Sequence, residues 1–188
     1  LTDAAAAGLR VSATMYPYAA GGTRLAAVLP LWAQEGGNDA MLARLADPAA
    51  RARMRKQVEG TTDGWENLLM AATFDGVQIA SVPAEYDQAI VGKRLGEIAA
   101  ARKADPWDVL FEIIAGTKGR AGALYHMMSE DDVRTGLAAP MVSIGTDSAA
   151  IRHDGPLAQG QPHPRAYGTF PRVLGHYVRE TRLLTLEE

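Results

Sequence analysis

The sequence contains no cysteine, no long apolar run and no excess of positive charge, and each absence excludes a class of protein. Without cysteine, neither a disulfide nor a thiolate metal ligand can form within this chain. No stretch of about 18 uninterrupted apolar residues occurs, so no segment is predicted to span a membrane. Nineteen Lys and Arg residues against 22 Asp and Glu give a formal net charge of -3. This balance disfavours a nucleic acid or an anionic membrane as partner, and a small molecule is the expected ligand.

What is present is typical of a globular protein with a substantial core, since the 188 residues are 47% hydrophobic and 22% charged. The opening LTDAAAAGLR is typical of a helix that ends at Gly8, and the closing TLEE resembles the first turn of another helix. Both ends therefore look cut, and we expect the chain to be a part of a longer protein. The expected location is the cytoplasm.

Hydrophobic periodicity predicts strands and helices in alternation. The expected strands cover residues 10–15, 120–127 and 141–145, with a hairpin over 67–82 that turns at Asp75-Gly76. The expected helices lie in 25–58, from 95 to 102, from Asp105-Pro106 onward, and from Ser129, where Asp132 completes a capping box, to before Pro140. Helix and strand in this order are typical of βαβ units around a parallel sheet, so we predict an α/β fold.

Asp147 is the first candidate for chemistry, because it follows the buried strand MVSIG directly. In a parallel α/β protein the carboxyl ends of the strands form the functional face, so an acidic residue there points at the usual ligand site. The alternative is that Asp147 only caps a turn. A loop from Ala149 to Pro162 follows, and its length without a regular element is typical of a lid or binding segment.

Arg165, Tyr16 and Tyr18 are candidates for binding a carboxylate. Arg165 follows the long loop and offers a planar, two-pronged donor, while the tyrosines follow the first predicted strand beside Gly21 and Gly22. A solvated arginine and tyrosines that only pack their rings are the alternatives. The four histidines show no HxH or HExxH spacing, so no complete metal site is predicted within this chain.

Three segments carry a resemblance to a known family. They are YPYAAG at residues 16–21, GTD at 145–147 and, as the most specific, HPRAYGTFPRVLG at 163–175. Together they resemble the N-acyl-D-amino-acid deacylase (D-aminoacylase) family of the amidohydrolase superfamily, over nearly the whole chain. Two features differ from the family pattern: Gly22 stands where members often have Ser, and the loop after Asp147 is longer.

The resemblance implies a partial (β/α)8 barrel that comprises the last strands and helices, with an inserted, mainly helical lobe. Its expected division is a barrel strand and loop at 1–24, the inserted lobe at 25–91, and the final β/α units with the active-site loop at 92–188. It also implies a zinc-dependent hydrolase of N-acyl-D-amino acids in which Asp147 is the catalytic acid and base and a possible weak zinc ligand. Arg165 and Tyr16 would bind the substrate α-carboxylate. The family's other zinc ligands are absent from this chain, so the isolated chain is expected to bind no metal and to be inactive.

Two further functions stay open at the level of sequence. The chain could be a non-catalytic module that binds a carboxylate or pairs with another subunit, or a cyclic-amide hydrolase similar to hydantoinase or dihydroorotase. Because an excised piece of barrel would present unpaired strand edges and an apolar face, we also expect it to self-associate.

Overall fold

The structure is a computed structural model that describes residues 1–60, 64–158 and 160–187. It divides the chain into two compact units. Unit 1 comprises Leu1–Ala19, Met128–Ala158 and His163–Glu188, and unit 2 comprises Ala20–Met127 and Gln159–Pro162. These limits differ from the division at residues 24 and 91 expected from the sequence, which stays a prediction.

Unit 2 is built on a three-stranded sheet in the order β2-β4-β3, and both pairings are antiparallel. The strands are β2 (Ala20–Arg24), β3 (Val77–Ser81) and β4 (Gly122–His126). Tyr125 lies in the central strand with its ring fully buried, and its hydroxyl donates to the carbonyl oxygen of Arg24 at 2.9 Å. The expectation of a parallel sheet is therefore wrong for this unit, because long-range antiparallel pairing is not visible in helix and strand order alone.

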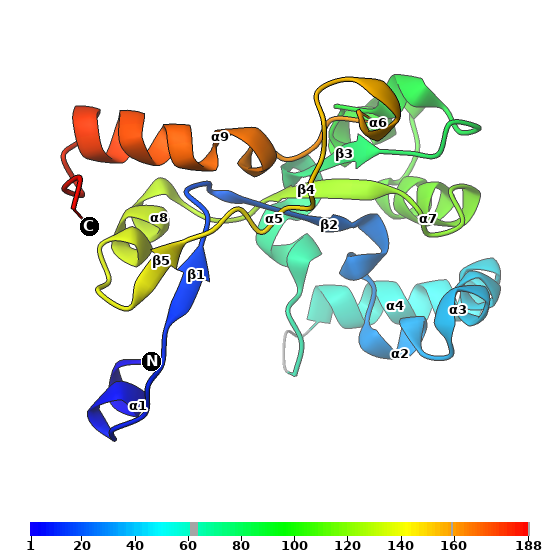
Figure 1. Cartoon of the computed structure of the whole chain (residues 1–188). Helices are drawn as coiled ribbons and strands as arrows, with labels where there is room; N and C mark the ends of the chain where they lie inside the picture. Colours follow the sequence, from blue (N-terminus) through cyan, green and yellow to red (C-terminus); the bar gives the residue numbers. More distant parts are fainter. Residues whose placement is uncertain (61–63, 159, 188) are drawn as a thin grey trace. The chain divides into compact units, whose positions relative to one another are not determined.

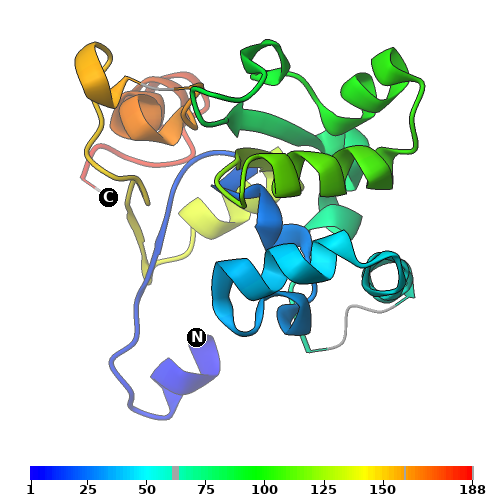
Figure 2. The ribbon, with the colours of Figure 1, turned by 90° about the vertical axis from the view of Figure 1, so that its right-hand side faces the viewer.

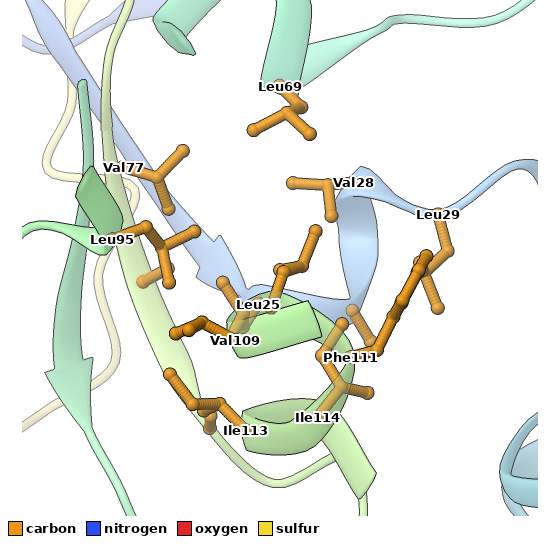
Figure 3. Packing of buried hydrophobic residues seen from close by; sticks show 14 of the residues in the cluster. Leu25, Val28, Leu29, Leu69, Val77, Leu95, Val109, Phe111, Ile113 and Ile114 are labelled. Carbon is orange, nitrogen blue, oxygen red and sulfur yellow. The ribbon is translucent and has the colours of Figure 1, made fainter. Parts of the chain in front are cut away.

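The helices of unit 2 and its sheet form one hydrophobic core. The helices are η1 (Leu25–Val28), α2 (Leu31–Gln34), α3 (Gly37–Ala46), α4 (Pro48–Gly60), α5 (Leu68–Gly76), η2 (Gln88–Ile90), α6 (Leu95–Arg102) and α7 (Pro106–Gly116). α5 and α6 lie next to the strands, and α2, α3 and α4 are grouped together (Figures 1 and 2). Figure 3 shows residues of this core, among them Leu25 and Val28 of η1 and Ile113 and Ile114 of α7. The predicted helices in 25–58 and at 95–102 and 106–116 are confirmed, and α7 begins as expected because the Asp105 side chain accepts from the Trp107 amide at 2.7 Å.

The hairpin predicted over residues 67–82 is wrong in its first half. Residues 68–76 form α5, because the side chain of Asn67 caps this segment as a helix by accepting from the amide of Met70. Only the second half is a strand, β3. The expected lobe also includes residues 61–63, which lie outside the described part of the chain.

Unit 1 pairs two short strands and packs helices against them. β1 (Ala13–Met15) and β5 (Val142–Ile144) are parallel, with Met15 opposite Ile144. The other elements are α1 (Thr2–Ala6), α8 (Glu130–Leu137), η3 (Gly155–Leu157), α9 (Arg165–Arg172) and the π-helix η4 (Val173–Glu180). The predicted capping box of α8 is confirmed, since Ser129 and Asp132 each accept from the other's amide.

The core of unit 1 is small. Its buried residues are Val133 and Leu137 of α8 and Val173 and Tyr177 of η4, with Ile144 of β5 among the residues packed against them. The chain leaves unit 1 after residue 19 and returns at residue 128, where the Met128 amide donates to the Ala19 carbonyl at 3.2 Å.

No helix in the described residues combines the length and apolar character needed to cross a bilayer.

Candidate functional site

The candidate site forms where the two parallel strands of unit 1 end. β1 ends at Met15 and is followed by Tyr16, while β5 ends at Ile144 and is followed within three residues by Asp147. Because the strands pair in parallel and in register, both residues leave the sheet at its carboxyl edge. The predicted placement of Tyr16 and Asp147 at strand ends is thus confirmed. The two residues lie 131 positions apart in the sequence, but the pairing of β1 with β5 brings them to the same edge.

Asp147 presents its carboxylate outward from an unusual backbone conformation. Its φ angle is 44°, in the left-handed region that Asp and Asn enter more readily than other residues with a side chain. The side chain is 72% exposed, so the carboxylate is open to solvent. Oδ2 of Asp147 lies 3.0 Å from Nη1 of Arg165.

Arg165 brings the candidate residues together. Its guanidinium stands over the Tyr16 ring at 4.6 Å from the centroid, and the side chain is only 11% exposed. A guanidinium in such a poorly hydrated position interacts more strongly with an anion than a solvated arginine does. The pair Tyr16 and Arg165 is therefore suited to bind a carboxylate beside Asp147.

His163 contacts the backbone of Arg165 and thereby helps to orient it. Its ring is buried, and Nδ1 accepts the backbone N–H of Arg165 at 2.9 Å, which satisfies a donor at the start of α9. The ring also lies 5.6 Å from the Tyr16 ring and 5.3 Å from the Tyr18 ring, the latter edge to face. A ring nitrogen that accepts a hydrogen bond carries no proton, so this contact requires an unprotonated Nδ1.

Tyr18 packs directly against α9. A Cβ atom added at Gly168 would overlap the Tyr18 hydroxyl oxygen, so any larger residue there requires the Tyr18 ring to shift. Burial raises the pKa of Tyr18 above its usual value, and the positive charge of Arg172, at 5.3 Å from the ring centroid, acts in the opposite direction. The phenol therefore stays neutral at physiological pH.

The sequence did not single out His163, Gly168 or Arg172 as functional. The spacing of Gly168 and Arg172 by four residues, which places both on one face of a helix, is the signal that could have found them. His163 was judged by metal-ligand spacing alone. The contact of His163 with the Arg165 amide requires α9 to begin at Arg165. The only sequence signal for that start is Pro164 just before it.

The described residues do not fit a metal site of their own. Among them, no group of three His, Asp or Glu side chains comes together in a way that could hold a metal ion.

Comparisons with known proteins place these features in context. No family model matches the chain. It is 45% identical over 96 residues to a D-aminoacylase and 40% identical over 96 residues to an N-acyl-D-glutamate deacylase, both from Alcaligenes xylosoxydans xylosoxydans. Each match covers 51% of this chain and 17% of the relative. The chain thus spans about a sixth of the length of these curated relatives.

Two solved structures are similar in fold over nearly the whole chain. N-acyl-D-glutamate deacylase from Bordetella bronchiseptica, complexed with zinc and a phosphonate mimic of the tetrahedral intermediate, has a TM-score of 0.62 and 27% identity, covering 99% of this chain and 28% of that one. A D-aminoacylase described as defining a novel subset of amidohydrolases has a TM-score of 0.57 and 32% identity, covering 98% and 27%.

Proposed function

We propose that this chain, a relative of the N-acyl-D-amino-acid deacylases in sequence and in fold, is part of a metal-dependent hydrolase. The whole protein would cleave the amide bond of an N-acyl-D-amino acid to a carboxylate and a free D-amino acid. The observation that carries the proposal is the position of Arg165, which contacts Asp147 at 3.0 Å while it stacks on Tyr16 at the carboxyl edge of β1 and β5.

The fold proposed for the whole protein is a (β/α)8 barrel, of which this chain supplies the last strands and helices together with an inserted, mainly helical lobe. The parallel pair β1 and β5 supports this, because neighbouring barrel strands are parallel. The proposed limits are 1–24 and 92–188 for the barrel parts and 25–91 for the lobe.

In the proposed reaction, Arg165 and the hydroxyl of Tyr16 hold the α-carboxylate of the substrate. Asp147 then accepts a proton from the water whose oxygen attacks the amide carbon. When the C–N bond breaks, Asp147 returns that proton to the leaving nitrogen, which departs as the free amine. The exposed carboxylate of Asp147 and the shielded guanidinium of Arg165 suit these two roles.

Zinc, with which the Bordetella bronchiseptica relative is complexed, would lower the pKa of a bound water when present. Since the described residues offer no such metal site, the ligands that hold zinc are proposed to lie in the remainder of the longer protein.

Asp147→Asn in the intact protein tests the catalytic role. Asparagine has the same shape and tolerates the left-handed backbone at this position, so the variant removes the charge without adding strain. We expect kcat to fall by about three orders of magnitude or more, in line with the loss of an essential acid-base group. Near-normal turnover by the variant would contradict the assignment of Asp147.

Arg165→Ala tests the binding role, with Arg179→Ala as matched control because Arg179 is an exposed arginine further along the same helical segment. We expect KM for N-acyl-D-amino acids to rise about 100-fold with a smaller change in kcat, since a hydrogen-bonded charge pair contributes about 1.5–3 kcal/mol. The control should leave KM unchanged. An unchanged KM in Arg165→Ala would remove Arg165 from the site.

The substrate panel separates the remaining alternatives. Hydrolysis of hydantoins or dihydroorotate in preference to linear N-acyl-D-amino acids would indicate a cyclic-amide hydrolase. Binding of carboxylates without hydrolysis of either class would indicate a non-catalytic module.

A further inference from the structure

We propose that Arg172 is a positioning residue that fixes the segment Tyr16-Pro17-Tyr18 against α9 and thereby sets the geometry of the carboxylate-binding pair Tyr16 and Arg165. The inference rests on the proposed function for the role of that pair. Arg172 itself contacts none of the groups proposed to touch the substrate, so its effect is transmitted through its neighbours.

Arg172 holds the apex of a tight turn. The amide of Tyr18 donates to the carbonyl of Tyr16 at 3.0 Å, which closes a turn centred on the buried Pro17. The carbonyl oxygen of Pro17 then accepts from Nε of Arg172 at 2.7 Å. The guanidinium also lies 5.3 Å from the centroid of the Tyr18 ring, a cation-π distance. One side chain thus contacts both the backbone and a ring of the segment.

Arg172 is in turn held from two other elements of unit 1. Its Nη2 donates to Glu130 of α8 at 3.2 Å, and the hydroxyl of Tyr177 in η4 donates to the same carboxyl group at 2.5 Å. Tyr177 is fully buried, so its hydroxyl has little freedom to turn away. Arg172, Glu130 and Tyr177 therefore form a connected polar junction, in which the buried Tyr177 hydroxyl anchors the partly exposed pair of Arg172 and Glu130.

The segment passes this constraint on to Arg165 through ring contacts. Tyr18 packs edge to face on His163, His163 packs on Tyr16, and His163 accepts the amide of Arg165. A shift of the turn would move the two tyrosine rings between which His163 is placed. The guanidinium of Arg165, stacked on Tyr16, would lose its orientation with them.

The four-residue spacing of Gly168 and Arg172 supports the same role. Both face Tyr18 from α9, one by allowing close approach at the hydroxyl and the other by a charge near the ring.

The test uses the intact protein with three variants. Arg172→Gln removes the charge and the fork of donors, Arg172→Lys keeps the charge but loses the fork, and Arg179→Gln is the matched control in the same helical segment. Substrates are an N-acyl-D-amino acid and its analogue with the α-carboxylate replaced by a carboxamide. Thermal unfolding is measured for each variant, so that kinetics are compared only between folded proteins.

For Arg172→Gln we expect KM for the carboxylate substrate to rise about tenfold, with kcat changed by less than about threefold. The kcat/KM for the carboxamide should stay at the wild-type value, because that analogue does not use the carboxylate-binding pair. Arg172→Lys should fall between wild type and Arg172→Gln. A parallel fall in kcat/KM for both substrates would mean a purely structural role and would overturn the proposal.

A second measurement does not depend on activity. In protein labelled with ¹⁵N-histidine, His163 should show a single tautomer with unprotonated Nδ1 and shifts displaced by the two tyrosine rings, assigned through His163→Gln. This signature should be lost in Arg172→Gln and retained in Arg179→Gln. An unchanged signature in Arg172→Gln overturns the positioning role. Absence of deacylase activity in the wild type would instead refute the proposed function, and the histidine signals would still decide the positioning.

Discussion

At the scale of single residues, the contact between Gly168 and Tyr18 leads to a sharp prediction. Gly168→Ala places a methyl group where the Tyr18 hydroxyl lies, so the ring must move. We expect a loss of about 1–3 kcal/mol in unfolding free energy, the usual cost of overpacking, together with a rise in KM. Gly175→Ala is the matched control, since nothing lies within 4 Å of its Cβ position, and it should stabilise the helix by roughly 0.5–1 kcal/mol. Equal effects of both variants in thermal unfolding would contradict this account.

Residue types and strand ends were enough to predict where Asp147 and Tyr16 lie, because the carboxyl edge of parallel strands is a rule of chain geometry. That Arg165 shares a site with Tyr16 was implied by the family resemblance and not by residue types or strand ends. Their functional roles stay predictions. The contribution of His163 could not be predicted, because it depends on one ring nitrogen meeting one amide at the start of a helix.

At the scale of elements, a tyrosine in the central strand β4 makes the stability of unit 2 fall as pH rises in the alkaline range. Burial raises the pKa of Tyr125 far above the usual value of about 10. The folded state therefore binds this proton more tightly than the unfolded state does. The corresponding stability is fully present below the unfolded pKa and is lost as pH rises above it.

Tyr125→Phe checks this dependence by denaturant unfolding at pH 7 and pH 11. At pH 7 we expect a loss of about 1 kcal/mol, because the hydrogen bond to the carbonyl of Arg24 disappears. Between the two pH values the variant should lose less stability than the wild type. If stability fell by the same amount in both proteins between pH 7 and pH 11, the pKa of Tyr125 would be the same in the folded and unfolded states, which would contradict this account.

Local signals predicted the elements whose ends are fixed by neighbouring residues. The capping boxes and caps at Ser129 and Asp105 located α8 and α7 correctly. The hairpin predicted over 67–82 is wrong at 68–76, because Asp75-Gly76 is typical of a turn but the Asn67 side chain caps a helix there. The antiparallel sheet of unit 2 joins strands far apart in sequence, and no local pattern encodes that pairing.

At the scale of the whole molecule, exposed apolar side chains lead us to expect self-association of the isolated chain. Tyr167, Phe170 and Leu174 of α9 and η4 are each about half exposed and lie at helical spacing on one face. Phe170→Glu combined with Leu174→Glu should shift the chain toward a monomer in analytical ultracentrifugation. A wild-type chain that is monomeric at all concentrations would refute the expectation.

The hydrogen bond between the amide of Met128 and the carbonyl of Ala19 has a consequence for evolution and engineering. The chain leaves unit 1 after Ala19 and re-enters it at Met128, and this hydrogen bond holds the two ends of the intervening segment together. The entropic free energy of closing such a segment rises by only about 0.6 kcal/mol for each doubling of its length. Lineages could therefore lengthen or shorten the loops within residues 20–127 while β1 and β5 keep their register. For the same reason, this junction is a place where a reporter domain could be grafted.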